Sequence, residues 1–193
     1  MRIAFKEWAV VVDALGTGEQ IIILRKGGIH EGSGGFKAEY QRFLLFPTLF
    51  HQQRDSVIES AQKRFDQISP EFPPSHELRL EFHAEVVDTR RLTTLEAAHA
   101  LRGQHIWRDE IIADRFDWGR EKNIYAMALR VFRLPEPKTM PLLPSYGGCK
   151  SWVDLDQDIG ASDSLLPVLA DDAFRFKLAS FQSALESVAQ SAS

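Results

Sequence analysis

A glycine-rich stretch combines the residue types that could bind an anion. Residues 24–37 read LRKGGIHEGSGGFK, in which an apolar run leads into two basic residues and five glycines follow within nine positions. Adjacent glycines allow backbone N–H groups to approach an anion closely, and basic side chains add charge. The candidate ligands of a phosphate group are Arg25, Lys26, Glu31 and Lys37. Neither GxxxxGK[ST] nor GxGxxG is present, so a connector whose glycines only satisfy turn geometry is the alternative.

Three residues outside this stretch could complete an anion site. His51 and Arg54 follow an apolar run, and both could bind phosphate, while His51 could also exchange protons. Local capping of a strand-to-helix junction is the alternative for this pair. Arg115 lies close to aromatic residues in the sequence and could clamp a phosphate or stack on a base, although packing at a helix end explains it equally well.

The segment YGGCKSW, residues 146–152, is a candidate pocket wall because it follows a proline-rich stretch and combines aromatic, glycine and basic residues. Its candidate binding residues are Tyr146, Lys150 and Trp152. Cys149 could act as a nucleophile because a neighbouring lysine favours the thiolate. Thiol catalysis also needs a base close in space, which sequence alone does not place. The alternative is a buried, inert cysteine.

Glu81, His83 and Glu85 alternate along a predicted strand, so the three side chains could share one face. Such a row could hold a metal ion or perform acid–base chemistry. A solvated sheet face with cross-strand ion pairs is the alternative. No HExxH pattern supports a metal site, and the sequence identifies no cofactor.

The composition is typical of a globular protein, with 193 residues, 44% hydrophobic and 26% charged. The net charge of −4 does not favour general attraction to nucleic acid or to membranes. The charge is uneven, however: residues 21–54 hold five basic and two acidic residues, and residues 153–193 hold two basic and seven acidic residues. A single cysteine fits a reducing, cytoplasmic setting. No signal-peptide pattern and no apolar run of about 20 residues is present, so we expect no membrane association.

Local patterns predict the elements that would position these residues. Strands are predicted at 8–12, 20–24, 42–46, 78–87 and 124–131, and helices at 55–65, 93 onward, 109–115 and 164 onward. The first two strands would form a hairpin. Thr93 and Glu96 predict a capping box, and Pro135, Pro137, Pro141 and Pro144 predict an irregular loop.

This element order predicts an α+β fold with a mixed, largely antiparallel sheet, open or barrel-like, flanked by helices and followed by a C-terminal helix. We expect residues 1–156 to form a single domain and residues 157–193 to form an acidic helical extension.

Four separated segments, KEWAVVVDAL, ILRKGGI, FLLFPTLFHQ and YGGCKSW, resemble the bacterial family named domain of unknown function 1802. The resemblance covers residues 6–154 and implies no activity or cofactor, because that family is uncharacterised. It marks Arg25, Lys26, Glu31, His51, Lys150 and Trp152 as family signatures. The segments FHAEVVDTRRLTTLEAAHAL and NIYAMALRVFRL are also similar to the strand–helix–strand half of PUA-like RNA-binding barrels. The lysine-and-acid loop motif of their ASCH-type members is not cleanly present.

These patterns lead to three hypotheses. The leading one is a cytoplasmic protein that binds a nucleotide or nucleic acid through the basic, glycine-rich loop. The second is a small hydrolase or transferase that uses Cys149 or the Glu81–His83–Glu85 row. The third is an adaptor whose C-terminal helix binds a protein partner or a second copy of the chain.

Overall fold

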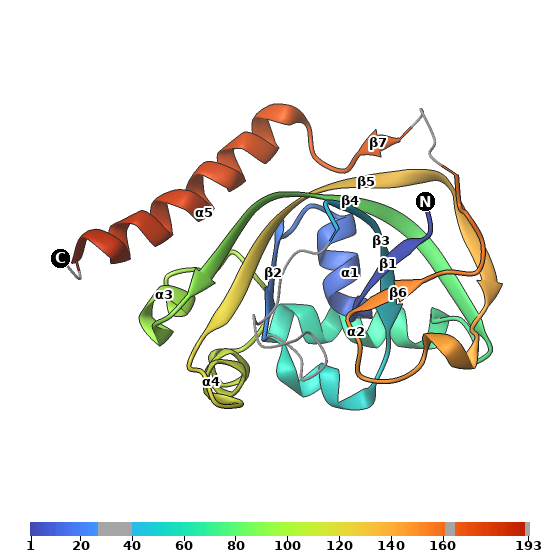
Figure 1. Cartoon of the computed structure of the whole chain (residues 1–193), viewed down its shortest axis with the longest axis horizontal. Helices are drawn as coiled ribbons and strands as arrows, with labels where there is room; N and C mark the ends of the chain where they lie inside the picture. Colours follow the sequence, from blue (N-terminus) through green and yellow to red (C-terminus); the bar gives the residue numbers. More distant parts are fainter. Residues whose placement is uncertain (27–39, 161–164, 192–193) are drawn as a thin grey trace.

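The computed structural model describes residues 1–26, 40–160 and 165–191. A mixed sheet arches over one buried helix (Figure 1), with strand order β2-β5-β4-β3-β1-β6 and β7 paired to β5. The strands are β1 (Ile3–Trp8), β2 (Ile22–Arg25), β3 (Arg42–Thr48), β4 (Glu77–Leu92), β5 (Ile124–Pro141), β6 (Trp152–Asp154) and β7 (Leu166–Pro167). The pair β1–β3 is parallel and the remaining pairs are antiparallel. The predicted α+β class with a mixed, curled sheet is confirmed.

One helix lies beneath the arch of this sheet, and the C-terminal helix lies outside the arch (Figure 1). They are α1 (Ala9–Gly16), α2 (Glu59–Glu71), α3 (Leu95–His99), α4 (Asp109–Asp117) and α5 (Asp171–Ser191), with 3₁₀ turns η1 (His51–Ser56) and η2 (Pro144–Tyr146). The predicted helix at 109–115 is confirmed as α4. The helix predicted at 55–65 begins later, at Glu59, and continues to Glu71 through Pro70.

The predicted strand at 8–12 is wrong, because Ala9 to Gly16 form α1. All residues of this helix except Asp13 are buried under the curled sheet. A helix that is apolar on nearly every side has no hydrophobic periodicity that distinguishes it from a buried strand, so the local pattern predicted a strand here. The hairpin is wrong for the same reason: β2 pairs with β5, and β1 pairs with β3 and β6.

The strand β5 extends far beyond the predicted 124–131, into the proline-rich stretch that predicted an irregular loop. Its ladder with β4 pairs Phe82 with Arg133 and next pairs Leu80 with Lys138. Residues 134–137 therefore bulge opposite Glu81, and Pro135 and Pro137 lie where no ladder N–H is needed. The prolines shape the strand here and do not end it.

The same bulge changes which face of β4 each side chain occupies. Before it, Leu78 and Leu80 pack in a second core, on the face that carries Ala4 and Leu44. After it, Phe82 and Ala84 pack in the main core around α1. The register shift between Leu80 and Phe82 reverses the alternation of β4, and a second shift follows between Val86 and Asp88. The regular alternation predicted for 78–87 therefore holds only between these shifts and before the first one.

Both faces of the central strands are covered, which explains their continuous apolar sequence. In β3, Phe43 and Leu45 face the main core, whereas Leu44 and Phe46 face the second core. The second core is closed by the segment that contains η2 and β6, through Tyr146 and Val153. A strand buried on both faces reads as an uninterrupted apolar run.

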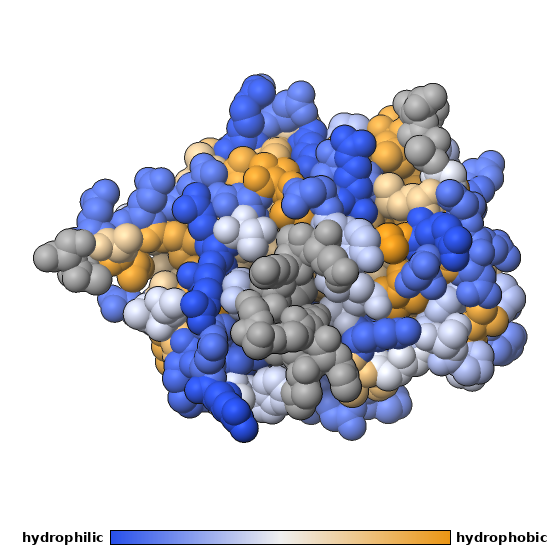
Figure 2. Space-filling view, viewed as in Figure 1, coloured by the Kyte–Doolittle hydropathy of each residue, from blue (hydrophilic) through white to orange (hydrophobic). Residues whose placement is uncertain are grey.

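The C-terminal helix α5 begins at Asp171, later than the predicted start at 164. Phe174 and Phe181 are buried in the main core, as their helical spacing predicted. Phe176 is 74% exposed, and Figure 2 shows apolar side chains along α5 on a mostly polar face. The predicted division between residues 1–156 and 157–193 stays a prediction.

The predicted N-cap of α3 needs correction. The N-cap of α3 is Thr94, whose hydroxyl accepts a hydrogen bond from the Ala97 backbone N–H at 3.2 Å. The predicted cap, Thr93, lies one residue too early. The chain after α3 passes through residues 100–108 to α4, and Val57 and Trp107 form an isolated bridge there.

Candidate functional site

A buried carboxylate and a half-buried guanidinium meet where β1 and β2 end. Glu7 is 1% exposed, and its Oε2 lies 3.7 Å from Nη1 of Arg25. Its Oε1 accepts a hydrogen bond from the Trp8 backbone N–H at 2.8 Å, but its Oε2 has no hydrogen-bond partner. Arg25 also donates from Nη2 to Ser151 Oγ at 2.9 Å, and its guanidinium lies 5.1 Å from the ring of Phe5. A buried carboxylate with a free acceptor is costly unless something compensates it.

A second guanidinium lies beside this pair. Arg115, from α4, donates to the carbonyl of Leu24 at 2.9 Å. Its guanidinium lies 4.7 Å from the ring of Trp8 and 4.9 Å from the ring of Trp107. Burial lowers the pKa of Arg115 to about 10, while Glu7 raises it and Arg25 lowers it. Arg115 is therefore still protonated at neutral pH.

Aromatic rings pack next to these charged groups. Trp152, at the start of β6, packs edge-to-face on Phe5 and Phe43 with centroid distances of 4.7 and 5.0 Å. Tyr40 packs on the outer side of Trp152 at 5.2 Å. We call the following set the arginine–aromatic cluster: Glu7, Trp8, Arg25, Trp107, Arg115, Ser151 and Trp152.

The electrostatic balance of this cluster favours an anion. It holds two guanidiniums and one carboxylate, which leaves one positive charge in a partly buried setting. The helix α1 starts at Ala9, directly after Glu7 and Trp8, and no side chain caps its N-terminus. The partial positive charge at this helix end adds to the same potential.

The structure brings together only some of the residues singled out from the sequence. Arg25, Arg115 and Trp152 belong to the arginine–aromatic cluster. Glu31 and Lys37 lie outside the described residues, as does most of the glycine-rich loop.

The ammonium of Lys26 is bonded to backbone carbonyls. It donates to the carbonyls of Phe116 and Asn123, at 3.0 and 2.9 Å, and to that of Glu121. It therefore ties the end of β2 to the chain that follows α4. Its pKa is lowered, mainly by burial.

His51 and Arg54 are not connected to the cluster by any described contact. His51 is exposed at the start of η1. Arg54 forms a two-pronged ion pair with Asp66 of α2, at 2.7 and 2.8 Å, on the protein surface. Their side-chain chemistry suggested phosphate binding, and the contacts of Arg54 are those of a surface salt bridge.

The segment 146–152 divides between two environments. Tyr146 is buried in the second core, and its hydroxyl accepts a hydrogen bond from the Asp156 backbone N–H at 3.0 Å. Lys150 is exposed and donates to the Ser145 carbonyl at 2.7 Å. Cys149 is a free, exposed cysteine. The pKa of nearby Lys6 is lowered by burial and by Lys150, and raised by Cys149.

The bulge between Leu80 and Phe82 separates Glu81 from His83 and Glu85, which stay on one face of β4. Glu81 lies on the α1 side with Phe82, between Arg79 and Arg133, whereas His83 is buried opposite Leu44. Glu85 pairs with Arg42. Within the described part of the chain, no three His, Cys, Asp or Glu residues are grouped in a way that could hold a metal ion.

The sequence carried one unused signal for the cluster. Glu7 is a charge within the apolar run IAFKEWAVVV, and a charge in a buried segment requires a partner. Trp8, Trp107 and Ser151 had no such local signal, because their role depends on strands that meet from distant parts of the chain.

Comparisons with known proteins give a family and a distant structural likeness. Crystal structures of ASCH from Zymomonas mobilis, and of a mutant of that protein with one tyrosine changed to phenylalanine, are each 13% identical to the chain. The first covers 92% of this chain and 93% of its own, with a TM-score of 0.41. The second covers 92% and 96%, with a TM-score of 0.40. A likeness this distant carries no argument about function.

No curated protein matches the chain. Among the helices in the described residues, none has the length and apolar character needed to cross a membrane. A family model described as domain of unknown function (DUF1802) matches residues 4–180, and the chain therefore belongs to this family.

Proposed function

We propose that this protein binds a phosphate-bearing ligand, a nucleotide or a nucleic acid, at the arginine–aromatic cluster. The observation that carries the proposal is the surplus guanidinium: Arg25 and Arg115 surround a single carboxylate, Glu7, beside the uncapped N-terminus of α1. Phosphate is a biological anion that both guanidinium groups and helix N-termini bind.

The two arginines would have different roles. The Arg25 side chain is 22% exposed and donates to Ser151, so we assign it the direct contact with phosphate. Arg115 is held between Trp8 and Trp107 and bonded to the Leu24 carbonyl. It would contribute charge and hold the tryptophan rings in place.

Aromatic rings would recognise the rest of the ligand. Tryptophan faces stack on nucleobases without strong sequence preference, and Trp8 and Trp152 are the partly exposed tryptophans of the cluster. A nucleotide supplies an anion and a flat ring in one molecule, which matches the guanidiniums and these rings.

Binding can be measured by thermal shift and by fluorescence titration with inorganic phosphate, AMP, GMP, a short single-stranded RNA and a short single-stranded DNA, at two salt concentrations. We expect a nucleotide or oligonucleotide to bind, with affinity for an oligonucleotide falling as salt rises. Arg25→Gln should weaken binding about 10-fold or more, because a charge-assisted hydrogen bond contributes about 1.5–3 kcal/mol. The proposal fails if none of these probes binds, or if Arg25→Gln binds like the wild type.

Two further variants control for charge and folding. Arg175→Gln removes one positive charge from the exposed surface of α5, where Arg175 pairs only with Asp172 among the described contacts, and it should bind like the wild type. The double variant Glu7→Gln with Arg25→Gln removes both members of this ion pair, so neither is left without its partner; Arg115 keeps its hydrogen bond to the Leu24 carbonyl. It should fold and still lose phosphate binding.

A further inference from the structure

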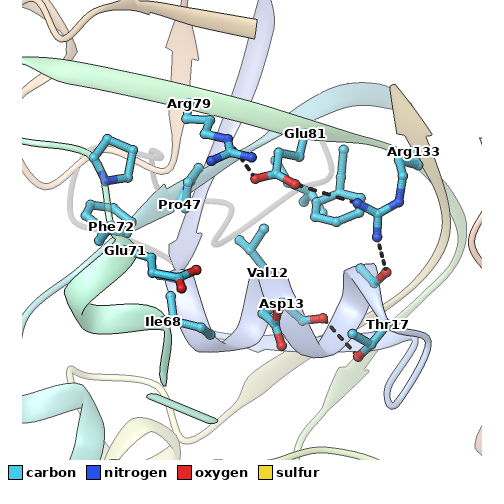
Figure 3. A pocket seen from close by; sticks show the side chains of 15 residues that line it. Val12, Asp13, Thr17, Pro47, Ile68, Glu71, Phe72, Arg79, Glu81 and Arg133 are labelled. Carbon is cyan, nitrogen blue, oxygen red and sulfur yellow. Dashed lines mark hydrogen bonds and ion pairs between the residues drawn. The ribbon is translucent and has the colours of Figure 1, made fainter. Parts of the chain in front are cut away.

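A second hollow lies away from the arginine–aromatic cluster, between α1, the end of α2 and strands β3 to β5 (Figure 3). Its volume is about 320 Å³, near the lower end of the range for small-molecule sites. The apolar part of its wall consists of Ala9, Val12, Leu45, Pro47, Ile68, Phe72, Pro73 and Phe82. Its polar part consists of Asp13, Thr17, Glu71, Arg79, Glu81 and Arg133.

The positive groups of this pocket are already occupied. Glu81 lies between two guanidiniums, 3.0 Å from Arg79 and 3.6 Å from Arg133. Arg133 also donates to the carbonyl of Gly16 at 3.2 Å and lies 4.7 Å above the ring of Phe82. Figure 3 shows these contacts joining the wall on one side of the hollow. An anion entering the pocket would have to displace Glu81 from both arginines.

The carboxylates are less well compensated. Asp13 lies 3.2 Å from Arg64, but Arg64 is shared with Glu19 at 2.5 Å. Burial is the main cause that raises the pKa of Asp13. Glu71 has no ion pair within the described parts of the chain, and its carboxylate points toward Val12 in Figure 3. Three carboxylates against two committed guanidiniums leave the pocket with a negative balance.

The C-terminal end of α2 adds to this balance. α2 ends at Glu71 in the pocket wall and has no basic residue in its last turn. The partial negative charge at a helix C-terminus favours a cation. The end of α1 does not contribute, because the Gly16 carbonyl already accepts a hydrogen bond from Arg133.

We propose that this pocket binds a small organic cation, an amine or amidine that carries a compact apolar body. The cationic group would lie between Asp13 and Glu71, and the apolar body would pack on Val12, Ile68 and Phe72. The apolar share of the wall favours this ligand over a hydrated inorganic cation, which would leave these surfaces without a partner.

Benzylamine, benzyl alcohol and benzoate test this proposal, because the three share one ring and differ in charge. Titration of the full-length protein by NMR or calorimetry should show that benzylamine binds more tightly than the alcohol, and that benzoate binds worst. Equal binding of benzylamine and benzyl alcohol, tighter binding of benzoate, or no binding of benzylamine would overturn the proposal.

A matched pair of variants on one helix locates the binding. Glu71→Gln should weaken benzylamine about 5-fold, since a partly exposed ion pair contributes up to about 1 kcal/mol. Glu59→Gln, at the exposed first turn of α2, removes the same charge away from the pocket and should leave the affinity unchanged. If both variants bind alike, the amine binds elsewhere and the assignment is wrong.

Discussion

Acid should destabilise this protein through His105, which is buried between α3 and α4. His105 is 6% exposed, and its ring lies 5.7 Å from that of Trp107. Burial lowers the pKa of His105 from 6.5 to about 4. Asp109 raises this pKa, and Arg115 and Arg102 lower it, but burial is the largest cause.

The sign follows from which state binds the proton. The unfolded chain protonates this imidazole near its ordinary pKa of 6.5, whereas the folded chain resists protonation down to about 4. The contribution of neutral His105 to the free energy of unfolding is therefore fully present above about pH 6.5, and it falls as the pH drops toward 4. A full shift of this size corresponds to about 3 kcal/mol, of which about 2 kcal/mol should be lost by about pH 5.

Urea unfolding followed by tryptophan fluorescence, at about pH 7.5 and about pH 5, measures this loss. His105→Leu should lose about 2 kcal/mol less than the wild type over this interval, because the titrating ring is gone. His76→Leu is the matched control, since the side chain of His76 is 77% exposed. His83 is also buried, with a pKa lowered by burial, so His105→Leu keeps some acid sensitivity. The reasoning is refuted if the wild type and His105→Leu lose equal stability.

Three more predictions concern packing and hydrogen bonding, and each is measured as the free energy of unfolding in urea. Phe181→Ala, at a fully buried position of α5, should lower this free energy by about 3–5 kcal/mol. Phe176→Ala, on the exposed side, should lower it by less than about 0.5 kcal/mol, and equal effects would contradict the docking of α5. Lys26→Met removes a donor to three carbonyls and should cost about 1–3 kcal/mol. Lys122→Met breaks only the exposed contacts with Asp117 and should cost less than about 1 kcal/mol. A larger cost for Lys122→Met would show that Lys26 is not structural. Gly16→Ala would place a methyl group 2.1 Å from the ring of Phe82 and should cost about 1–3 kcal/mol; Phe82→Leu in the same chain should recover part of this cost, and strictly additive costs would rule out the clash.

Local sequence patterns were sufficient to predict elements whose secondary structure depends mainly on their own residues. β4, α4 and the buried face of α5 follow from alternation and from helical spacing. α1 could not be predicted in this way, because its valines are buried by a sheet whose strands come from the whole chain. The extension of β5 through Pro135 and Pro137 depends on a bulge in its ladder with β4, which no local pattern encodes.

The candidate site shows the same limit. Arg25, Arg115 and Trp152 were recognisable as charged or aromatic residues in suggestive segments. Their association depends on the pairing of β6 with β1, which brings Ser151 to Arg25. Glu7 was missed although its charge interrupts an apolar run. His51 and Arg54 were included for their side-chain chemistry, and no described contact connects them to the cluster; Arg54 pairs with Asp66.

The indole N–H signals of the four tryptophans, at positions 8, 107, 118 and 152, test the proposed binding site most directly. Trp8 and Trp107 stack on Arg115, Trp152 follows Ser151, and Trp118 is exposed after α4. In a ¹⁵N NMR titration with a nucleotide or oligonucleotide that binds, with signals assigned by Trp→Phe variants, the signals of Trp8, Trp107 and Trp152 should shift most. If the ligand binds while these three signals stay still, or while only Trp118 shifts, the arginine–aromatic cluster is not the binding site.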